Sequence, residues 1–443
     1  MFFIQIGRPM RDVTTPDFKF QPYWWDAAAP VPFVSGELQS AYDVVVVGSG
    51  FTGISAALHL ARAGRSVAVL DRQDPGAGAS RRNAGFVGRV LKKSYSELVT
   101  SKGKEKALAI YRELHEAYTS TFDLIAREGI DCYAARPGRF IGATSRGHYE
   151  ALAKDLAILQ ADMGFEHRMV PPEDTAQGLA SDIYSGGVIV PDSGSLHPGL
   201  YHKGLLDRAV EAGVSVFGRT EVESLRELSG GTCEVRTDKG TVHAGKVVVA
   251  TNGYVSKLGW FRRRVVPFRA YMAATEEMPQ EMLDRLIPHG RTIIDSNTNI
   301  DFFRPAPDSR RILFGGATAA ALKNPEEITA RMKSIIDRVL PQAGDLKLSH
   351  AWDGYCAGTF DLMPHVGHRG SIYYAMGYNF AGVTMGTRFG ARIANSIVTG
   401  AELGSVFESK RFPTMPFYTG NPWFLGLVMR YFDWHDRQLA RRA

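Results

Sequence analysis

Residues 42–71, YDVVVVGSGFTGISAALHLARAGRSVAVLD, decide the fold of this 443-residue chain. The apolar run Val44–Val47 is typical of a strand that is buried on both faces of a parallel sheet. A glycine-rich turn, a helical segment and a second apolar strand follow, and the second strand ends at Asp71. This order predicts the first unit of a doubly wound α/β domain, the kind of domain that binds a dinucleotide.

Each of the three glycines in this turn has its own structural role. Gly48 permits the tight turn, Gly50 lets the backbone approach the phosphates, and Gly53 allows the helix to cross close to the strand. The helix N-terminus then directs free N–H groups and its positive dipole end toward the phosphates. Asp71 follows Gly53 at about the 20-residue separation expected of an acid that binds a ribose. The cofactor-binding residues predicted from this unit are Gly48, Gly50, Phe51, Thr52, Gly53, Asp71 and Arg72.

The next segment, DPGAGASRRNAG at 74–85, separates flavin from nicotinamide cofactors. It resembles the GAS-x-R-N-x-G segment of the D-amino-acid oxidase-like flavoenzymes, which include the glycine, sarcosine and gamma-glutamylputrescine oxidases. In that family the segment runs beside the FAD pyrophosphate and the isoalloxazine ring, so the resemblance implies FAD as the cofactor. The chain departs from the gamma-glutamylputrescine branch, which it resembles most, at Arg81, Ala84 and Phe86. The resemblance assigns cofactor contacts to Ala79, Ser80, Arg82, Asn83, Ala84 and Gly85.

Further segments match the family in the same order along nearly the whole chain. They are Thr220–Val222, VVVATNGY at 247–254, the stretch 352–367 and GYNFAGVTMGTRFGARIA from 377. The resemblance implies that Val222 contacts the adenine and that Ala250 and Thr251 lie beside the dinucleotide. The glycine-rich turn at 377 opens a helix whose N–H groups would stabilise negative charge on the reduced flavin. The residues assigned to that contact are Gly377, Phe380, Ala381, Gly382, Val383 and Thr384, with alanine at 381 where the family usually has histidine.

Cys356 has two interpretations. Sarcosine oxidases attach the flavin 8-methyl group to a cysteine at a similar distance before a threonine, and here Cys356 precedes Thr359. The resemblance therefore assigns Cys356 to the cofactor site as a covalent tether. The alternative is a small buried filler, since free cysteines are among the most buried residue types.

The sequence offers several candidates for the substrate side of the flavin. Arginine is the usual clamp for a carboxylate because its planar fork bonds the group bidentately. Arg81, Arg82, Arg304 and Arg388 flank the flavin segments, and each has the alternative of pairing with a nearby carboxylate or with the FAD phosphates. Tyr271, Phe302 and Phe303 form either an aromatic wall over the substrate nitrogen or part of the core. The predicted catalytic residues are Arg81, Tyr271, Phe303, Arg304 and Asn379.

The same segments predict an α/β fold class with two domains. One is a Rossmann-like FAD-binding domain, and the other is an α+β substrate domain built on a mostly antiparallel sheet. Residues 103–129 and 146–163 have the apolar periodicity of amphipathic helices. The expected division is residues 41–105, 186–258 and 350–405 for the FAD-binding domain, 106–185 and 259–349 for the substrate domain, 1–40 as an N-terminal extension and 406–443 as a C-terminal tail that packs on the body.

Composition narrows the classes of function. The three cysteines are odd in number and far apart, which argues against a disulfide framework or a zinc site and for a reducing, cytoplasmic location, with no metal. The net charge is +6, but the basic residues are dispersed and no nucleic-acid-binding motif is present, so no nucleic-acid partner is expected. The aromatic C-terminal stretch lacks the lysine-rich face of an interfacial helix, so membrane association is not expected. The oligomeric state stays open.

The resemblance implies oxidation of a small-molecule amine. The expected substrate is a secondary or primary amine that carries a carboxylate, such as an N-substituted glycine of the iminodiacetate or sarcosine type, or gamma-glutamylputrescine. Hydride passes from the carbon next to nitrogen to flavin N5, the imine hydrolyses to an aldehyde or keto acid, and molecular oxygen reoxidises the flavin with formation of H2O2. Two alternatives stay open: an amino-acid dehydrogenase that passes electrons to a quinone or another acceptor, and a non-catalytic flavin-binding scaffold.

Overall fold

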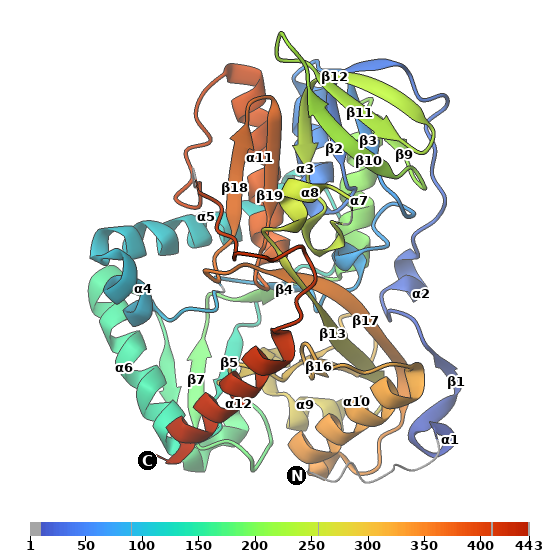
Figure 1. Cartoon of the computed structure of the whole chain (residues 1–443). Helices are drawn as coiled ribbons and strands as arrows, with labels where there is room; N and C mark the ends of the chain where they lie inside the picture. Colours follow the sequence, from blue (N-terminus) through green and yellow to red (C-terminus); the bar gives the residue numbers. More distant parts are fainter. Residues whose placement is uncertain (1–9, 90, 256, 409–410, 442–443) are drawn as a thin grey trace.

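The structure is a computed structural model that describes residues 10–89, 91–255, 257–408 and 411–441. Within these residues the strands form two large sheets and one small two-stranded sheet, β4 (Phe86–Val87) with β8 (Gly194–Ser195). Figure 1 shows one large sheet in the upper half of the molecule and the other in the lower half. The segments that connect them cross between the two halves several times.

The segment that decides the fold lies at the centre of the first large sheet. β2 (Ala41–Val47) and β3 (Val67–Leu70) are parallel neighbours joined by α3 (Phe51–Arg62). Val44–Val47 are no more than 5% exposed, as expected of a strand covered on both faces. The predicted unit of strand, turn, helix and strand is therefore confirmed.

We call this first sheet the dinucleotide sheet. Parallel pairing of β2 with both β3 and β12 places the carboxyl ends of these strands at one edge, where ligands bind in doubly wound folds. In the described part of the chain its order is β10 (Val222–Glu227), β11 (Cys233–Thr237), β12 (Gly240–Val249), β2, β3 and β9 (Ser215–Phe217), with β19 (Ile372–Met376) also beside β12 and β18 (His365–Arg369) beside β19.

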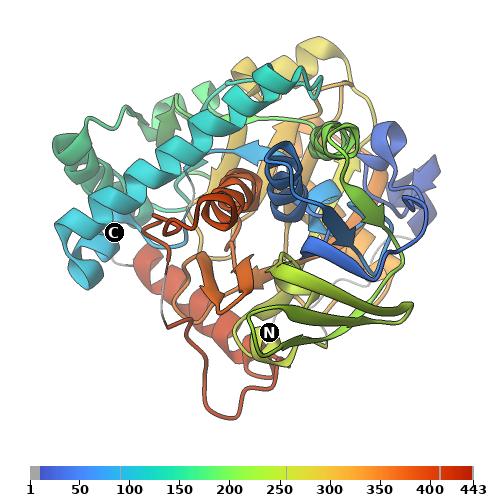
Figure 2. The same ribbon diagram turned by 90° about the horizontal axis from the view of Figure 1, so that it is seen from above.

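Two helices that begin at this edge pack closely against each other. α3 lies between α11 (Gly382–Thr399) and α7 (Pro198–Glu211), and Figure 2 shows the three helices nearly end-on. A Cβ atom at Gly390 would lie 2.4 Å from the carbonyl oxygen of Thr52, so glycine is required at this crossing. The Thr52 hydroxyl also hydrogen-bonds the Tyr378 hydroxyl at 2.5 Å. The N-termini of α3 and α11 are thereby held side by side.

The second large sheet is mostly antiparallel. α10 (Pro325–Val339) covers one of its faces, and the other face is turned toward residues 82–86 and the N-terminal segment. Among the described residues the strand order is β1 (Thr14–Lys19), β17 (Leu348–Gly358), β13 (Val266–Thr275), β16 (Ile312–Gly316), β15 (Phe302–Pro305), β14 (Thr292–Asp295), β5 (Arg139–Gly142), β7 (Gly187–Val190) and β6 (Arg168–Val170).

The chain crosses between the sheets at points that the sequence did not indicate. β7 and most of β17 fall in segments expected in the FAD-binding domain, yet both strands belong to the second sheet. β1, from the expected N-terminal extension, forms an edge strand of the same sheet and pairs with β17 in parallel. The division into domains stays a prediction.

The two predicted amphipathic helices are α5 (Lys104–Glu128) and α6 (Arg146–Met163). The C-terminal tail forms α12 (Leu425–Arg441), which packs on α6 and leaves Leu427, Tyr431 and Trp434 exposed. None of the helices in the described ranges is both long enough and apolar enough to span a membrane.

Candidate cofactor and active site

The turn after β2 has no room for side chains. Gly48 has a φ of +102°, and a Cβ atom on it would lie 2.8 Å from the Ala250 carbonyl oxygen. A Cβ atom at Gly53 would lie 1.9 Å from the carbonyl oxygen of Gly48. Only glycine fits these two positions, so the backbone of the turn is exposed to whatever binds at this edge.

Asp71 closes the turn from the end of β3. Its Oδ2 atom accepts hydrogen bonds from the amide of Ser49 at 2.8 Å and from the Ser49 hydroxyl at 2.6 Å, and its Oδ1 atom accepts one from Gln73 N at 2.9 Å. Burial raises the pKa of Asp71, and the hydrogen bonds from Ser49 and Gln73 oppose that rise. The carboxylate is thus fixed next to the glycine turn, where the sequence predicts the ribose.

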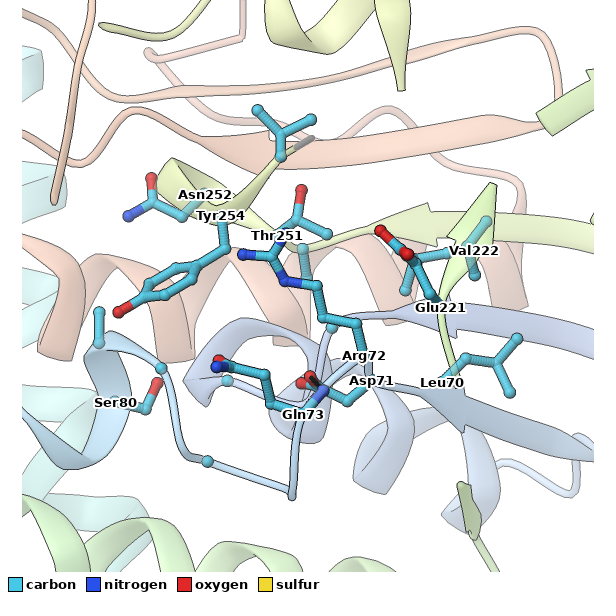
Figure 3. Close-up of a pocket in the computed structure, with 18 of the residues that line it drawn as sticks. Leu70, Asp71, Arg72, Gln73, Ser80, Glu221, Val222, Thr251, Asn252 and Tyr254 are labelled. Atoms are coloured by element: carbon cyan, nitrogen blue, oxygen red, sulfur yellow. Dashed lines mark hydrogen bonds between the residues drawn. The ribbon is translucent and has the colours of Figure 1, made fainter. Parts of the chain in front are cut away.

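A pocket of about 750 Å³, part of it open to solvent, runs from this turn along the edge of the dinucleotide sheet. Figure 3 shows Arg72 extending from the end of β3 across the pocket toward Thr251. Val222 lies at the start of β10 on the pocket wall, as the resemblance implies for the adenine site. The predicted cofactor residues that line this one pocket are Gly48, Gly50, Asp71, Arg72, Ala79, Ser80, Val222, Ala250 and Thr251.

One atom of the pocket wall lacks a partner. The Thr251 Oγ1 atom is buried and makes no hydrogen bond with the described residues. Buried hydroxyls are normally hydrogen-bonded, so an unpaired one in a pocket indicates a polar ligand atom beside it. A phosphate or ribose oxygen of a dinucleotide satisfies that requirement.

The segment 79–85 is fixed by hydrogen bonds to its carbonyl groups. The Trp352 indole donates to the Arg82 carbonyl at 2.9 Å, and the Trp24 indole donates to the Asn83 carbonyl at 2.8 Å. Arg304 Nη1 donates to the carbonyls of Ala84 and Gly85 at 3.1 and 3.3 Å. The sequence analysis missed Trp24, which lies far from every motif. Trp352 is the first residue of the stretch 352–367, which the sequence analysis matched to the family.

Ser80 joins this segment to α3. Its hydroxyl accepts a hydrogen bond from the amide of Phe51 at 3.0 Å, and a Cβ atom at Gly50 would lie 2.9 Å from the same hydroxyl. Asn83 closes the turn by accepting a hydrogen bond from Gly85 N at 2.8 Å. The structure therefore brings the predicted residues 79–85 against the predicted residues 50–52.

The four candidate arginine clamps are all engaged elsewhere. Arg81 is 3% exposed and donates to His202 and to the carbonyls of Ala28 and Ala29. Arg82 donates to the carbonyls of Ala77 and Asp353, and Arg388 pairs with Glu116 on α5. Arg304 also donates to Leu196 O at 2.7 Å. Burial lowers the pKa of Arg81 and of Arg304 to about 10, so both remain cations at neutral pH.

The predicted aromatic wall is divided between the two faces of the second sheet. Tyr271 and Phe303 point into the core under α10, where Tyr271 donates to Ala320 O at 2.6 Å and Phe303 stacks on Phe314. Phe302 points to the other face and meets the Phe86 ring edge-on, with centroids 5.9 Å apart. Alternation along a strand places neighbouring residues on opposite faces, so Phe302 and Phe303 cannot share one wall.

The second glycine-rich turn has the geometry of an anion site. Gly377, Asn379 and Phe380 have φ values of +74°, +47° and +79°, and the turn leads into the 18-residue helix α11. Asn379 stabilises the turn by donating to Gly377 O at 2.6 Å and to the Thr359 hydroxyl at 3.1 Å. The first N–H groups of an α-helix have no partner within the helix, which leaves those of residues 382–384 for a ligand.

Cys356 lies on the face of β17 that is turned to these segments. Its neighbours on that face are Gly354, where a Cβ atom would lie 3.4 Å from Arg82, and Gly358, where a Cβ atom would lie 3.4 Å from the Asn379 amide oxygen. Burial raises the pKa of the Cys356 thiol to about 12, and the positive charge of Lys92 opposes this rise. Cys356 is therefore a protonated thiol between two predicted flavin segments, and the covalent tether stays a prediction.

Lys92 lies beside the turn before α11, and the sequence analysis did not single it out. It follows β4 in a stretch without a motif, and its Nζ atom lies 4.8 Å from the centroid of the Phe380 ring.

The described residues bring no cluster of His, Cys, Asp and Glu together that would hold a metal ion.

FAD fits this arrangement. The pocket beside Asp71 and Val222 would hold the adenosine half, the turn before α3 the pyrophosphate, and the turn before α11 the pyrimidine end of the flavin. FAD, when bound, supplies a hydride acceptor at flavin N5. Residues 82–86, β17 of the second sheet and the N-terminus of α11 would hold the flavin ring.

Comparison with known proteins identifies relatives along most of the chain. A family model for FAD dependent oxidoreductases (DAO) matches residues 43–396. The chain is 31% identical over 384 residues to the probable oxidoreductase OrdL of Haemophilus influenzae. The aligned residues cover 84% of this chain and 86% of that protein. It is 28% identical over 401 residues to the gamma-glutamylputrescine oxidoreductase of Escherichia coli, and the aligned residues cover 89% of this chain and 93% of that protein.

A solved structure has the same fold. Glycine oxidase from Geobacillus kaustophilus superposes with a TM-score of 0.69 at 20% sequence identity, over 85% of this chain and 99% of that one. This match confirms the predicted α/β fold class, and the family match confirms the resemblance and FAD as the cofactor. The chain therefore belongs to the FAD dependent oxidoreductase (DAO) family.

Proposed function

We propose that the protein is an FAD-dependent oxidase of a secondary or primary amine that carries a carboxylate. The observation that carries this proposal is the meeting of residues 82–86 with the second sheet, where Phe86 and Phe302 are in contact. A substrate between the flavin and this apolar surface would be shielded from water. Amine oxidation needs little more than that, because the reacting C–H bond must only be held against flavin N5.

The similarity to a gamma-glutamylputrescine oxidoreductase supports an amine that carries a carboxylate. Gamma-glutamylputrescine and N-substituted glycines such as sarcosine or iminodiacetate are the substrates we propose to test. In each, hydride leaves the carbon next to nitrogen for flavin N5, and water hydrolyses the imine that forms. Molecular oxygen then takes the two electrons of the reduced flavin and is released as H2O2.

The test is an anaerobic titration of the purified flavoprotein with these amines, followed at the flavin absorbance band at about 450 nm. We expect one of them to bleach the flavin, and we expect colour and peroxide to appear when air is admitted. A flavin that none of the amines reduces would refute the proposal.

A second candidate is an amino-acid dehydrogenase that passes electrons to a quinone at a membrane. The exposed side chains Leu427, Tyr431 and Trp434 on α12 favour it, because aromatic side chains are enriched at membrane interfaces. A reduced flavin that a soluble quinone reoxidises much faster than air does would support this candidate. For either candidate we propose a reducing compartment, since all three cysteines are free thiols.

A further inference from the structure

We propose that Lys92 binds the carboxylate of the amine substrate and so determines which amines the enzyme accepts. This inference rests on the proposed function, and it deepens it by assigning the missing anion clamp.

Lys92 lies next to two predicted flavin segments. Its Nζ atom faces the ring of Phe380 in the turn before α11, and the Phe380 ring contacts Phe268 with centroids 5.7 Å apart. Phe268 is the strand partner of Cys356, whose thiol is close enough for its pKa to respond to the charge of Lys92. Lys92 therefore lies beside the predicted flavin segments, and the residue as a whole is only partly exposed to solvent.

The ammonium group has donors to spare. It carries three N–H donors, and its hydrogen bond in the described structure goes to the Thr298 carbonyl oxygen at 2.8 Å. No carboxylate forms an ion pair with it in the described ranges. The two acids that influence its charge, Asp295 and Asp436, accept hydrogen bonds from Asn297 and from Thr298 respectively.

The loop that holds Lys92 is itself anchored. Asp436 on α12 accepts hydrogen bonds from the Thr298 amide and hydroxyl, both at 2.8 Å. The C-terminal helix thus fixes the carbonyl group that orients Lys92. A partly buried cation that is held in place and lacks an anionic partner is a suitable site for a ligand carboxylate.

The arginines offered by the sequence do not fill this role. Arg304, which shares the substrate-facing side of the second sheet with Phe302, gives its Nη1 hydrogens to backbone carbonyls. Arg139 is the remaining competitor, because its Nη2 atom is buried without a partner. It is 4% exposed and lies against the ring of Phe86, 5.2 Å from the centroid, whereas Lys92 is partly exposed. We therefore favour Lys92 and include Arg139 in the test.

The charge of Lys92 gives the proposal a pH signature. Burial lowers the pKa of Lys92 to about 8, against the influence of Asp295, Asp436 and Cys356, which raises it. Below about pH 8 the group is a cation and binds the carboxylate, and above it the charge is lost. An amine without a carboxylate does not depend on that charge, so a matched pair of substrates separates this effect from titration of the amine itself.

The experiment compares Lys92→Met, Lys92→Arg, Arg139→Met and the neighbouring Lys93→Met with the wild-type holoenzyme. The substrates form two matched pairs, gamma-glutamylputrescine with N-acetylputrescine and sarcosine with dimethylamine. In each pair only the first member carries a carboxylate. In the pair that the wild type oxidises, we expect Lys92→Met to raise KM for the carboxylate-bearing member about 10- to 100-fold, which is the loss expected for a charge-assisted hydrogen bond. We expect the other member of each pair to be unaffected, Lys92→Arg to recover part of the loss, and Lys93→Met to behave as wild type.

Binding of acetate or glutarate, followed by the change in flavin absorbance, provides a readout that does not require turnover. In the wild type this binding should weaken above about pH 8, where Lys92 loses its charge. We expect Lys92→Met to bind these anions more weakly and without that dependence on pH. Unchanged KM and binding in Lys92→Met with normal flavin content, or the same losses in Arg139→Met instead, would overturn the assignment. Failure of the proposed function is a separate result, since the wild-type flavin would then be reduced by no amine at all.

Discussion

Arg81 donates a hydrogen bond from Nε to the Nδ1 atom of His202 at 3.0 Å, and both side chains are buried. Because Nδ1 accepts this bond, the proton of the neutral imidazole is on Nε2, which donates to Ser49 O at 2.6 Å. The glycine turn of the dinucleotide site is thus supported from behind by a neutral histidine. Arg81 also donates to the carbonyls of Ala28 and Ala29, so the N-terminal segment belongs to the same network.

This network predicts a loss of stability in acid. Burial and the charge of Arg81 lower the pKa of His202 from 6.5 to about 3. A depressed folded-state pKa means that the unfolded chain binds the proton first, so the stabilisation is complete above about pH 6.5 and declines as pH falls toward 3. The free energy of unfolding should decrease by up to about 1.4 kcal/mol per pH unit through this group.

Denaturant unfolding of the wild type and of His202→Gln between pH 7 and pH 5 measures the contribution of this group. The glutamine variant should be less stable at pH 7 but should lose less stability on acidification. Identical pH slopes in the two proteins would show that His202 does not titrate as proposed. His197, whose pKa burial lowers to about 4, contributes equally to both proteins and cancels in the comparison.

Gly53→Ala should prevent correct formation of the dinucleotide turn. The added Cβ atom would lie 1.9 Å from the carbonyl oxygen of Gly48, which is backbone and cannot rotate away. We expect a loss of at least about 1–3 kcal/mol of unfolding free energy, together with loss of bound FAD. Gly259→Ala is the matched control, since nothing lies within 4 Å of a Cβ atom there, and it should retain its flavin and its melting temperature.

Thr251→Val separates cofactor binding from stability. The valine has the same shape but lacks the buried hydroxyl that has no partner in the described protein. We expect the FAD dissociation constant to rise about 5- to 10-fold, and the apoprotein to be as stable as the wild type or more stable by up to about 1 kcal/mol. Fluorescence titration with FAD and thermal melting of the apoprotein give the two values. A destabilised apoprotein would mean that the hydroxyl has a protein partner instead.

The dinucleotide half of the site could be predicted from the sequence because its determinants are local. Gly48, Gly53 and Asp71 belong to one continuous unit of strand, turn, helix and strand, and their spacing is set by the geometry of that unit. The match of the later flavin segments added the turn before α11. These parts could be placed without knowing how distant segments meet.

The substrate half depends on contacts between distant segments. Phe302 and Phe303 are equally aromatic, and only the pairing of β15 with β14 and β16 decides which ring faces the flavin segments. The role of Arg81 depends on residues 28 and 29, and Lys92 is placed by a carbonyl group at residue 298. No spacing in the sequence specifies these partners, so the arginine clamps could be proposed only from residue type and from their positions beside the flavin segments.

Arg304→Lys tests whether Arg304 is structural. Its Nη1 atom donates to the carbonyls of Ala84, Gly85 and Leu196, and its Nε atom donates to the Pro305 carbonyl at 3.1 Å. Lysine has a single donor atom and cannot occupy both positions of the rigid guanidinium. We expect a loss of about 2–3 kcal/mol of unfolding free energy and weaker FAD binding, with no preferential effect on carboxylate-bearing amines. Arg310→Lys, at an exposed ion pair with Glu277, is the control and should change stability by less than about 0.5 kcal/mol. If Arg304→Lys instead raised KM for carboxylate-bearing amines and left stability unchanged, Arg304 would be the clamp that the sequence first indicated, and the assignment of Lys92 would fall with it.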